Sequence, residues 1–107
     1  MELFTEETET ELQKQYKDGS SLSQNVIVKI FNPYSSWALY IINQDPKDPD
    51  YLWAIVKGFE VEIGSVSKSE LTTQRVPPFN TPLERDLFFT STNTKEVWNK
   101  LRRGEHV

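Results

Sequence analysis

The stretch YLWAIVKGFEVEI, residues 51–63, decides the fold predicted for this chain. Two β-rich runs flank Lys57-Gly58, and glycine is favoured in two-residue hairpin turns because these turns need a positive φ. A turn at this point sets Trp53 opposite Glu62. The segment is therefore predicted to be a β-hairpin whose register is fixed by that turn.

The predicted register sorts the side chains of this hairpin into two faces. The apolar face is expected to lie in the core and comprises Leu52, Ala54, Val56, Phe59, Val61 and Ile63. The other face mixes aromatic residues with acids and comprises Tyr51, Trp53, Ile55, Glu60 and Glu62. Exposed Trp and Tyr are typical of protein-binding hot spots. Tyr51, Trp53, Glu60 and Glu62 are therefore predicted partner-binding residues, the alternative being that a helix covers the two aromatic rings.

Helices and strands are predicted on both sides of this hairpin. Upstream lie a helix over residues 5–17 with Thr5 as its N-cap, strands over 25–31 and 37–44, and a polar loop over 45–50. The strand over 37–44 is apolar on both faces, which indicates a central strand covered by a helix. Downstream, a short helix is capped by Ser67, and a C-terminal helix is capped by Asn93. Between them lie a proline-rich crossing, which is expected to be irregular, and an extended segment. The predicted fold class is α+β: an antiparallel meander of about four strands with an N-terminal helix, a short capped helix and a C-terminal helix.

Composition limits the function classes. The chain has 107 residues, 36% hydrophobic and 12% aromatic, so one folded domain over residues 1–107 is expected. It has no cysteine, and its single histidine, His106, cannot build a histidine relay or a multi-histidine metal site. No cofactor or metal is therefore predicted. His106 is expected to lie in a frayed tail. No stretch is long enough and apolar enough to span a membrane or act as a secretory signal, so a cytoplasmic location is expected.

The negative charge is concentrated at the N-terminus. Residues 1–18 hold six acids against two lysines, which accounts for the whole net charge of −4. An acidic chain is not expected to bind nucleic acid directly, because that binding depends on Lys and Arg. It can bind a basic partner, and Glu6, Glu7 and Glu9 are predicted contact residues. The alternative is a well-capped, solvated helix without a binding role.

The segment TPLERDLFF, residues 81–89, sets three alternating charges beside an apolar run. In an extended chain Arg85 points away from Glu84 and Asp86, so Arg85 is predicted to reach back to an acid, such as Glu62, and to clamp the segment to the sheet. The alternative is a small hydrolase-like enzyme that uses Glu62 with Glu84 or Asp86 as acid and base. We favour the structural role and predict no catalytic residue.

Four stretches occur in the order LFTEE, VIVKIFNPYSSWALY, LWAIVKGFEVEIGSVSKSEL and TPLERDLFF. Over about residues 3–90 the chain resembles a family of short single-domain proteins of unknown function found on plasmids, phages and other mobile elements. Its motifs are matched by Trp37, by the Gly-Phe-Glu-x-Glu-Ile-Gly hairpin that starts at Gly58, and by the Pro-Leu-Glu-Arg-Asp-Leu segment that starts at Pro82. Here the stretch VPPFNT, just before that last segment, replaces the glycine-rich stretch that is usual in the family. Trp37 and Gly58 are predicted to have structural roles.

The resemblance implies a gene context of mobile-element accessory genes, some of which disarm host defences. The sequence therefore predicts a small non-catalytic protein that binds a host protein and blocks it, for example by occupying the basic nucleic-acid groove of a CRISPR nuclease. Two alternatives stay open: the small enzyme, and a regulatory subunit that forms a homodimer through an exposed strand edge or an aromatic face.

Overall fold

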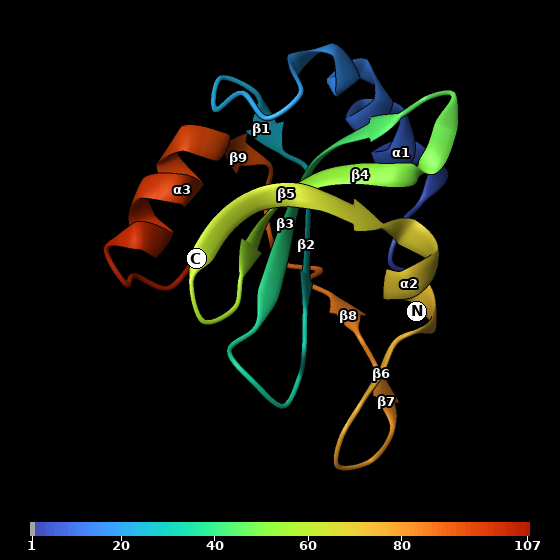
Figure 1. Ribbon diagram of the computed structural model, residues 1–107, viewed down its shortest axis with the longest axis vertical. Coiled ribbons are helices and arrows are strands. Elements are labelled where there is room, and N and C mark those ends of the chain that lie inside the picture. The colour runs from blue at the N-terminus through green and yellow to red at the C-terminus, as the bar shows by residue number, and fades with distance from the viewer. Residues whose placement is uncertain (1) are drawn as a thin grey trace.

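The computed structural model describes residues 2–107 and is built around a five-stranded antiparallel sheet (Figure 1). The strand order is β5-β4-β3-β2-β8. The strands are β2 (Val28–Phe31), β3 (Ala38–Asp45), β4 (Asp48–Lys57), β5 (Val61–Ser67) and β8 (Glu84–Arg85). Strands β2 to β5 form the predicted meander, and β8 adds a short edge strand beside β2. The α+β prediction is confirmed.

Three α-helices begin where side chains cap their free N–H groups. Helix α1 (Glu6–Lys14) begins after Thr5, which forms a reciprocal capping box with Thr8. Helix α2 (Lys68–Thr73) is capped by Ser67, and α3 (Thr94–Arg102) by Asn93, whose side chain accepts the N–H of Glu96. Each cap satisfies a donor that the helix itself leaves unpaired. All three predicted helices are confirmed, α1 being followed by a 3-10 turn, η1 (Tyr16–Asp18).

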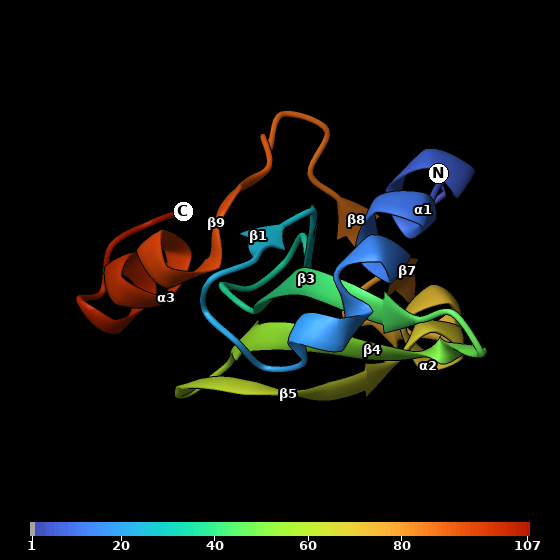
Figure 2. The same cartoon turned by 90° about the horizontal axis from the view of Figure 1, so that it is seen from above.

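The sheet is buried on both faces, which explains why β3 is apolar on both sides. Leu12 of α1 and Leu71 of α2 lie in one core cluster with Leu52 of β4. Val97 and Leu101 of α3 lie in a second cluster on the opposite face. Figure 2 shows α1 and α2 on one side of the molecule and α3 on the other.

Two short strand pairs complete the fold. Strand β1 (Asn25–Val26) pairs with β9 (Thr92–Asn93), and β6 (Arg75–Val76) pairs with β7 (Thr81–Pro82). The proline-rich crossing was predicted to be irregular, but β6 and β7 form a small hairpin there. The polar loop predicted over residues 45–50 is confirmed only at Pro46 and Lys47, which form a turn, since β3 extends to Asp45 and β4 starts at Asp48.

The predicted register of the β4–β5 hairpin is wrong. Lys57 pairs with Val61 across a three-residue loop, and Trp53 pairs with Ser65. Gly58 does not adopt a positive φ. The observed register places the buried Ile55 opposite Ile63, whereas the predicted turn would have set Ile55 opposite an acid.

This register changes the surface that was predicted from it. Phe59 was expected in the core, but it lies in the loop and is fully exposed. Glu62 pairs with Val56 and lies on the face opposite Trp53. The mixed aromatic and acidic face is therefore not formed by the residues that the sequence predicted.

Candidate functional site

The two predicted aromatic contact residues do lie together. The rings of Tyr51 and Trp53 meet edge to face, with centroids 6.2 Å apart and an interplanar angle of 83°. Tyr51 is 37% exposed, while Trp53 is partly buried against the cluster that contains Ile55. Glu60 lies in the β4–β5 loop and Glu62 on the other face of the sheet, so neither acid joins this aromatic pair.

Other acids gather around Tyr51. A hollow of about 300 Å³ opens at the end of the sheet where β3 turns into β4. Asp48 and Asp50 at the start of β4, Tyr51, and Glu70 of α2 line it. We call these four residues the acidic hollow. None of the three acids was predicted to be a contact residue. Asp48 and Asp50 were assigned to a polar loop, although the run DPKDPD that contains them is rich in acids, and Glu70 lies outside that run.

Hydrogen bonds hold one of these acids in place. The Ser67 hydroxyl donates to Asp50 Oδ2 at 2.7 Å, and the Ser69 main-chain N–H donates to Asp50 Oδ1 at 2.7 Å. The Ser67 bond first, and then the bonds from Ser69, lower the pKa of Asp50 below its ordinary value. Asp50 is therefore negatively charged at neutral pH and fixed in position.

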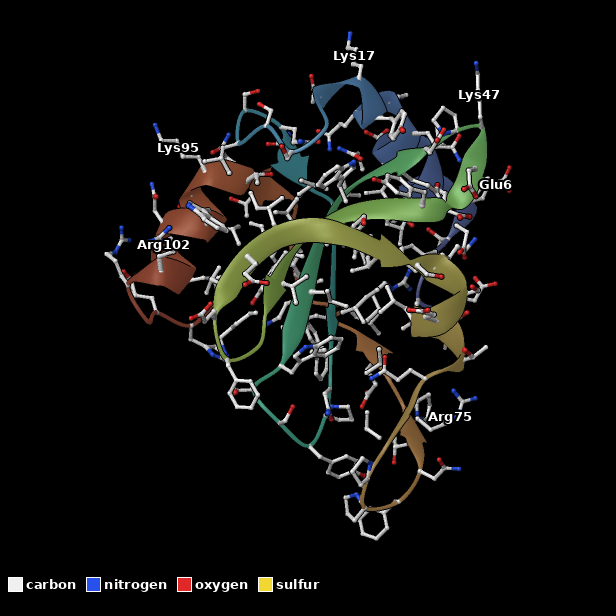
Figure 3. The ribbon with its side chains drawn as sticks, viewed as in Figure 1. Glu6, Lys17, Lys47, Arg75, Lys95 and Arg102 are labelled. Carbon is white, nitrogen blue, oxygen red and sulfur yellow. The ribbon has the colours of Figure 1, made fainter. Side chains whose placement is uncertain are left out.

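The N-terminal acids divide into two groups. Glu6 and Glu7 are exposed, and Figure 3 shows Glu6 pointing outward at the same end of the molecule as Lys47 of the β3–β4 turn. Glu9 instead forms an ion pair with Lys68 of α2 and accepts a hydrogen bond from Gln44 of β3 at 2.9 Å. Burial works to raise the pKa of Glu9, but the contacts with Gln44 and Lys68 outweigh it and lower the pKa. Glu9 therefore joins α1 to the sheet and to α2.

The charged triplet lies at the edge of the sheet opposite to β5. Arg85 pairs with Ile30 and Glu84 with Phe31, so Arg85 points to the other face from Glu84. Glu62 lies on the outer strand β5, four strand spacings from β8, which corresponds to roughly 19 Å. Arg85 therefore does not reach Glu62, so this version of the predicted clamp is wrong. The convergence of Glu62 with Glu84 or Asp86 that the enzyme hypothesis requires is also missing.

Asp86 fastens this segment by a different contact. Its carboxylate lies 3.5 Å from the ammonium group of Lys29 in β2, and its main-chain N–H donates to the Lys29 carbonyl at 2.9 Å. The side-chain oxygen Oδ1 also accepts the N–H of Phe88 at 2.9 Å. The segment thus attaches to the sheet through β2 rather than through β5.

A second hollow, of about 260 Å³, surrounds this buried lysine. The Lys29 ammonium group donates to the main-chain oxygen of Val107 at 2.6 Å, and the Tyr40 hydroxyl donates to the same oxygen at 3.2 Å. Burial, together with the charge of Asp86, raises the pKa of Tyr40 to about 12. We call the hollow lined by Lys29, Tyr40, Trp37, Asp86 and Val107 the Lys29 pocket. The sequence signal for it was one lysine inside an otherwise apolar strand.

Trp37 and Gly58, both predicted to be structural, lie together beside this pocket. A Cβ atom added to Gly58 would lie 3.5 Å from Cδ1 of Trp37, and Trp37 packs against the core cluster on the α1 side of the sheet. His106, expected to be part of a frayed tail, is exposed but lines the pocket.

Two further properties concern the whole described chain. Within residues 2–107, no group of three or more His, Cys, Asp or Glu residues is arranged to hold a metal ion. No helix in this range is long and apolar enough to cross a membrane.

Comparison with protein families gives one match over nearly the whole chain. The model described as "Protein of unknown function (DUF2958)" matches residues 3–106. Comparisons with curated proteins and with solved structures find no significant match. The family match supports the resemblance to a family of unknown function but contains no statement about mobile elements.

Proposed function

We infer the function of this protein from its geometry, because the chain belongs to the DUF2958 family, which is described as being of unknown function. We propose that it is a small non-catalytic binding protein whose acidic hollow captures a basic partner. The observation that carries this proposal is the grouping of three carboxylates, from Asp48, Asp50 and Glu70, around the half-exposed ring of Tyr51.

The chemistry of the hollow suits a cationic surface. Asp50 is fixed by two hydrogen bonds before any partner arrives, so its charge is positioned at no further entropic cost on binding. Tyr51 adds an aromatic face beside these charges, and an aromatic face attracts Lys and Arg through its quadrupole. Carboxylates beside an aromatic ring therefore favour a partner rich in Arg or Lys.

A nucleic-acid-binding surface of another protein is the partner that we propose. Such surfaces are rich in Lys and Arg, because they neutralise phosphates. The exposed Glu6 of α1 adds negative charge at the end of the molecule where Lys47 lies, and the next residue, Glu7, is exposed as well. With the resemblance to proteins of phages and other mobile elements, this favours an inhibitor that acts in the cytoplasm on a host defence protein, such as a CRISPR nuclease.

Charge reversal in the hollow tests this proposal. The variant Asp48→Lys/Glu70→Lys should lose a host protein that the wild type captures from lysate, and duplex DNA should release that protein from the wild type. The matched control Glu60→Lys/Glu62→Lys makes the same change of charge on residues that lie outside the hollow, and it should retain capture. Loss of capture in the control, with capture retained in the first variant, would refute the proposed surface.

A homodimer is the second candidate, and one observation favours it. Strand β5 is seven residues long, lies at the edge of the sheet and contains neither lysine nor proline. Natural proteins commonly protect edge strands with these residues. In the part of the chain that the structure describes, no strand pairs with the outer side of β5. Sedimentation equilibrium tests it: a dimer should revert to a monomer in the variant Ile63→Pro, and a wild-type monomer would refute the idea.

A further inference from the structure

The Lys29 pocket holds an unusual arrangement of donors. Lys29 lies in the interior of the sheet and is 9% exposed, so its ammonium group has lost most of its water. A buried ammonium group is costly unless oxygen atoms replace that water. Two oxygen atoms do so, one from Asp86 at 3.5 Å and one from Val107 at 2.6 Å.

The two donors of the pocket converge on a single oxygen atom. Lys29 and Tyr40 both donate to the main-chain oxygen of Val107. Because the pKa of Tyr40 is raised to about 12, its hydroxyl keeps its proton at neutral pH and remains a donor. The Lys29 ammonium nitrogen also lies 5.7 Å from the centroid of the Tyr40 ring. An ammonium group has three N–H donors, and the two oxygen contacts of Lys29 leave the third for another oxygen. The pair can therefore bind both oxygens of a carboxylate.

The other residues that line the pocket favour a ligand that has a negative charge and an apolar body. Lys57 and His106 line the pocket beside Lys29, while Asp86 is the one acidic side chain among its described lining residues, although the chain as a whole carries a net charge of −4. Phe31 and Trp37 supply apolar walls. The volume of about 260 Å³, which is that of the hollow with Val107 in place, lies just below the range for ligand pockets, so it suits a ligand about the size of one ring.

We propose that the Lys29 pocket binds a small organic carboxylate with an apolar body, in the place that the main-chain oxygen of Val107 now occupies. Lys29 and Tyr40 hold the carboxylate, and Trp37 contacts the apolar body. Val107 is partly buried against the core cluster on the α3 side, and the segment after α3 turns back toward the sheet (Figure 1). Displacement of this segment opens the site.

The probe is sodium benzoate, titrated into the full chain at constant ionic strength and followed by two-dimensional amide NMR. Resonances of the Lys29 pocket should shift and saturate, whereas benzyl alcohol, which has no charge, should cause much weaker shifts. Lys29→Met should weaken benzoate binding about 10- to 100-fold, because it removes the charged donor. Tyr40→Phe should weaken it severalfold, and Lys17→Met, outside the pocket, should leave it unchanged.

Several outcomes would overturn the proposal. They are the absence of saturable shifts in the wild type, equal binding of benzyl alcohol, or equal affinity in Tyr40→Phe. If Lys29→Met does not fold, Tyr40→Phe decides, because it removes a single hydroxyl from a buried ring. Val107→Ser should tighten benzoate binding by loosening the competing segment, and unchanged or weaker binding would contradict displacement.

Discussion

Breaking the ion pair between Lys29 and Asp86 is the sharpest test of how the segment that contains Asp86 is attached to the sheet. The substitution Asp86→Asn removes the charge but keeps an oxygen that can accept the N–H of Phe88. The two side chains are 11% and 26% exposed. Breaking a fully buried pair costs about 3–5 kcal/mol, and an exposed pair contributes about 0–1 kcal/mol. Since Lys29 keeps its hydrogen bond to the main-chain oxygen of Val107, we expect Asp86→Asn to lower the free energy of unfolding by about 2 kcal/mol.

Thermal unfolding followed by circular dichroism measures this loss. An unfolding entropy of about 2.1 cal/mol/K per residue converts it to a fall in Tm of roughly 9 °C for this chain. The control Glu11→Gln breaks the exposed pair with Lys14, where the side chains are 55% and 66% exposed, and should lower Tm by less than about 2 °C. The double variant Lys29→Met/Asp86→Asn should lose less stability than the sum of the losses in the two single variants. Additive losses, or an Asp86→Asn variant no less stable than the control, would refute the reasoning.

Three further predictions concern the core, the turns and the pH dependence of stability. Leu12→Ala should cost about 3 kcal/mol in urea unfolding because Leu12 is fully buried, and a cost below about 1 kcal/mol would contradict its place in the core. Gly104→Ala should cost about 1 kcal/mol because Gly104 has a φ of +79°, while Gly58→Ala should be nearly neutral; the reverse order would contradict both turns. The lowered pKa of Glu9 means that its contribution is present above the ordinary pKa of 4.5 and is lost as the pH falls below it. Glu9→Gln should therefore destabilise the protein near pH 7 and much less near pH 3. An equal loss of stability at the two pH values would show that the charge of Glu9 is not the cause.

Local signals predicted the elements of the fold well. Thr5, Ser67 and Asn93 cap helices as expected, because capping depends on residues within one turn of the chain. The doubly apolar run of β3 correctly indicated a strand covered on both faces. These predictions succeeded because the pattern and the contact that explains it lie in the same short segment.

The candidate site depended on longer-range packing, and there the sequence was misleading. Lys57-Gly58 has the composition of a two-residue turn, but the pairing of Ile55 with Ile63 sets the register instead. The three-residue loop that results exposes Phe59. Nothing local to Lys29 shows that Val107 supplies an oxygen to it, because 78 residues separate the two.

The most direct test of the proposed function is the affinity of the purified partner for this protein, measured by calorimetry at two salt concentrations. We predict that Asp48→Lys/Glu70→Lys weakens binding by at least about tenfold at low salt, and that added salt weakens wild-type binding much more than it weakens that of the variant. Equal affinities for both proteins, or a wild-type affinity that does not change with salt, would contradict capture by the acidic hollow.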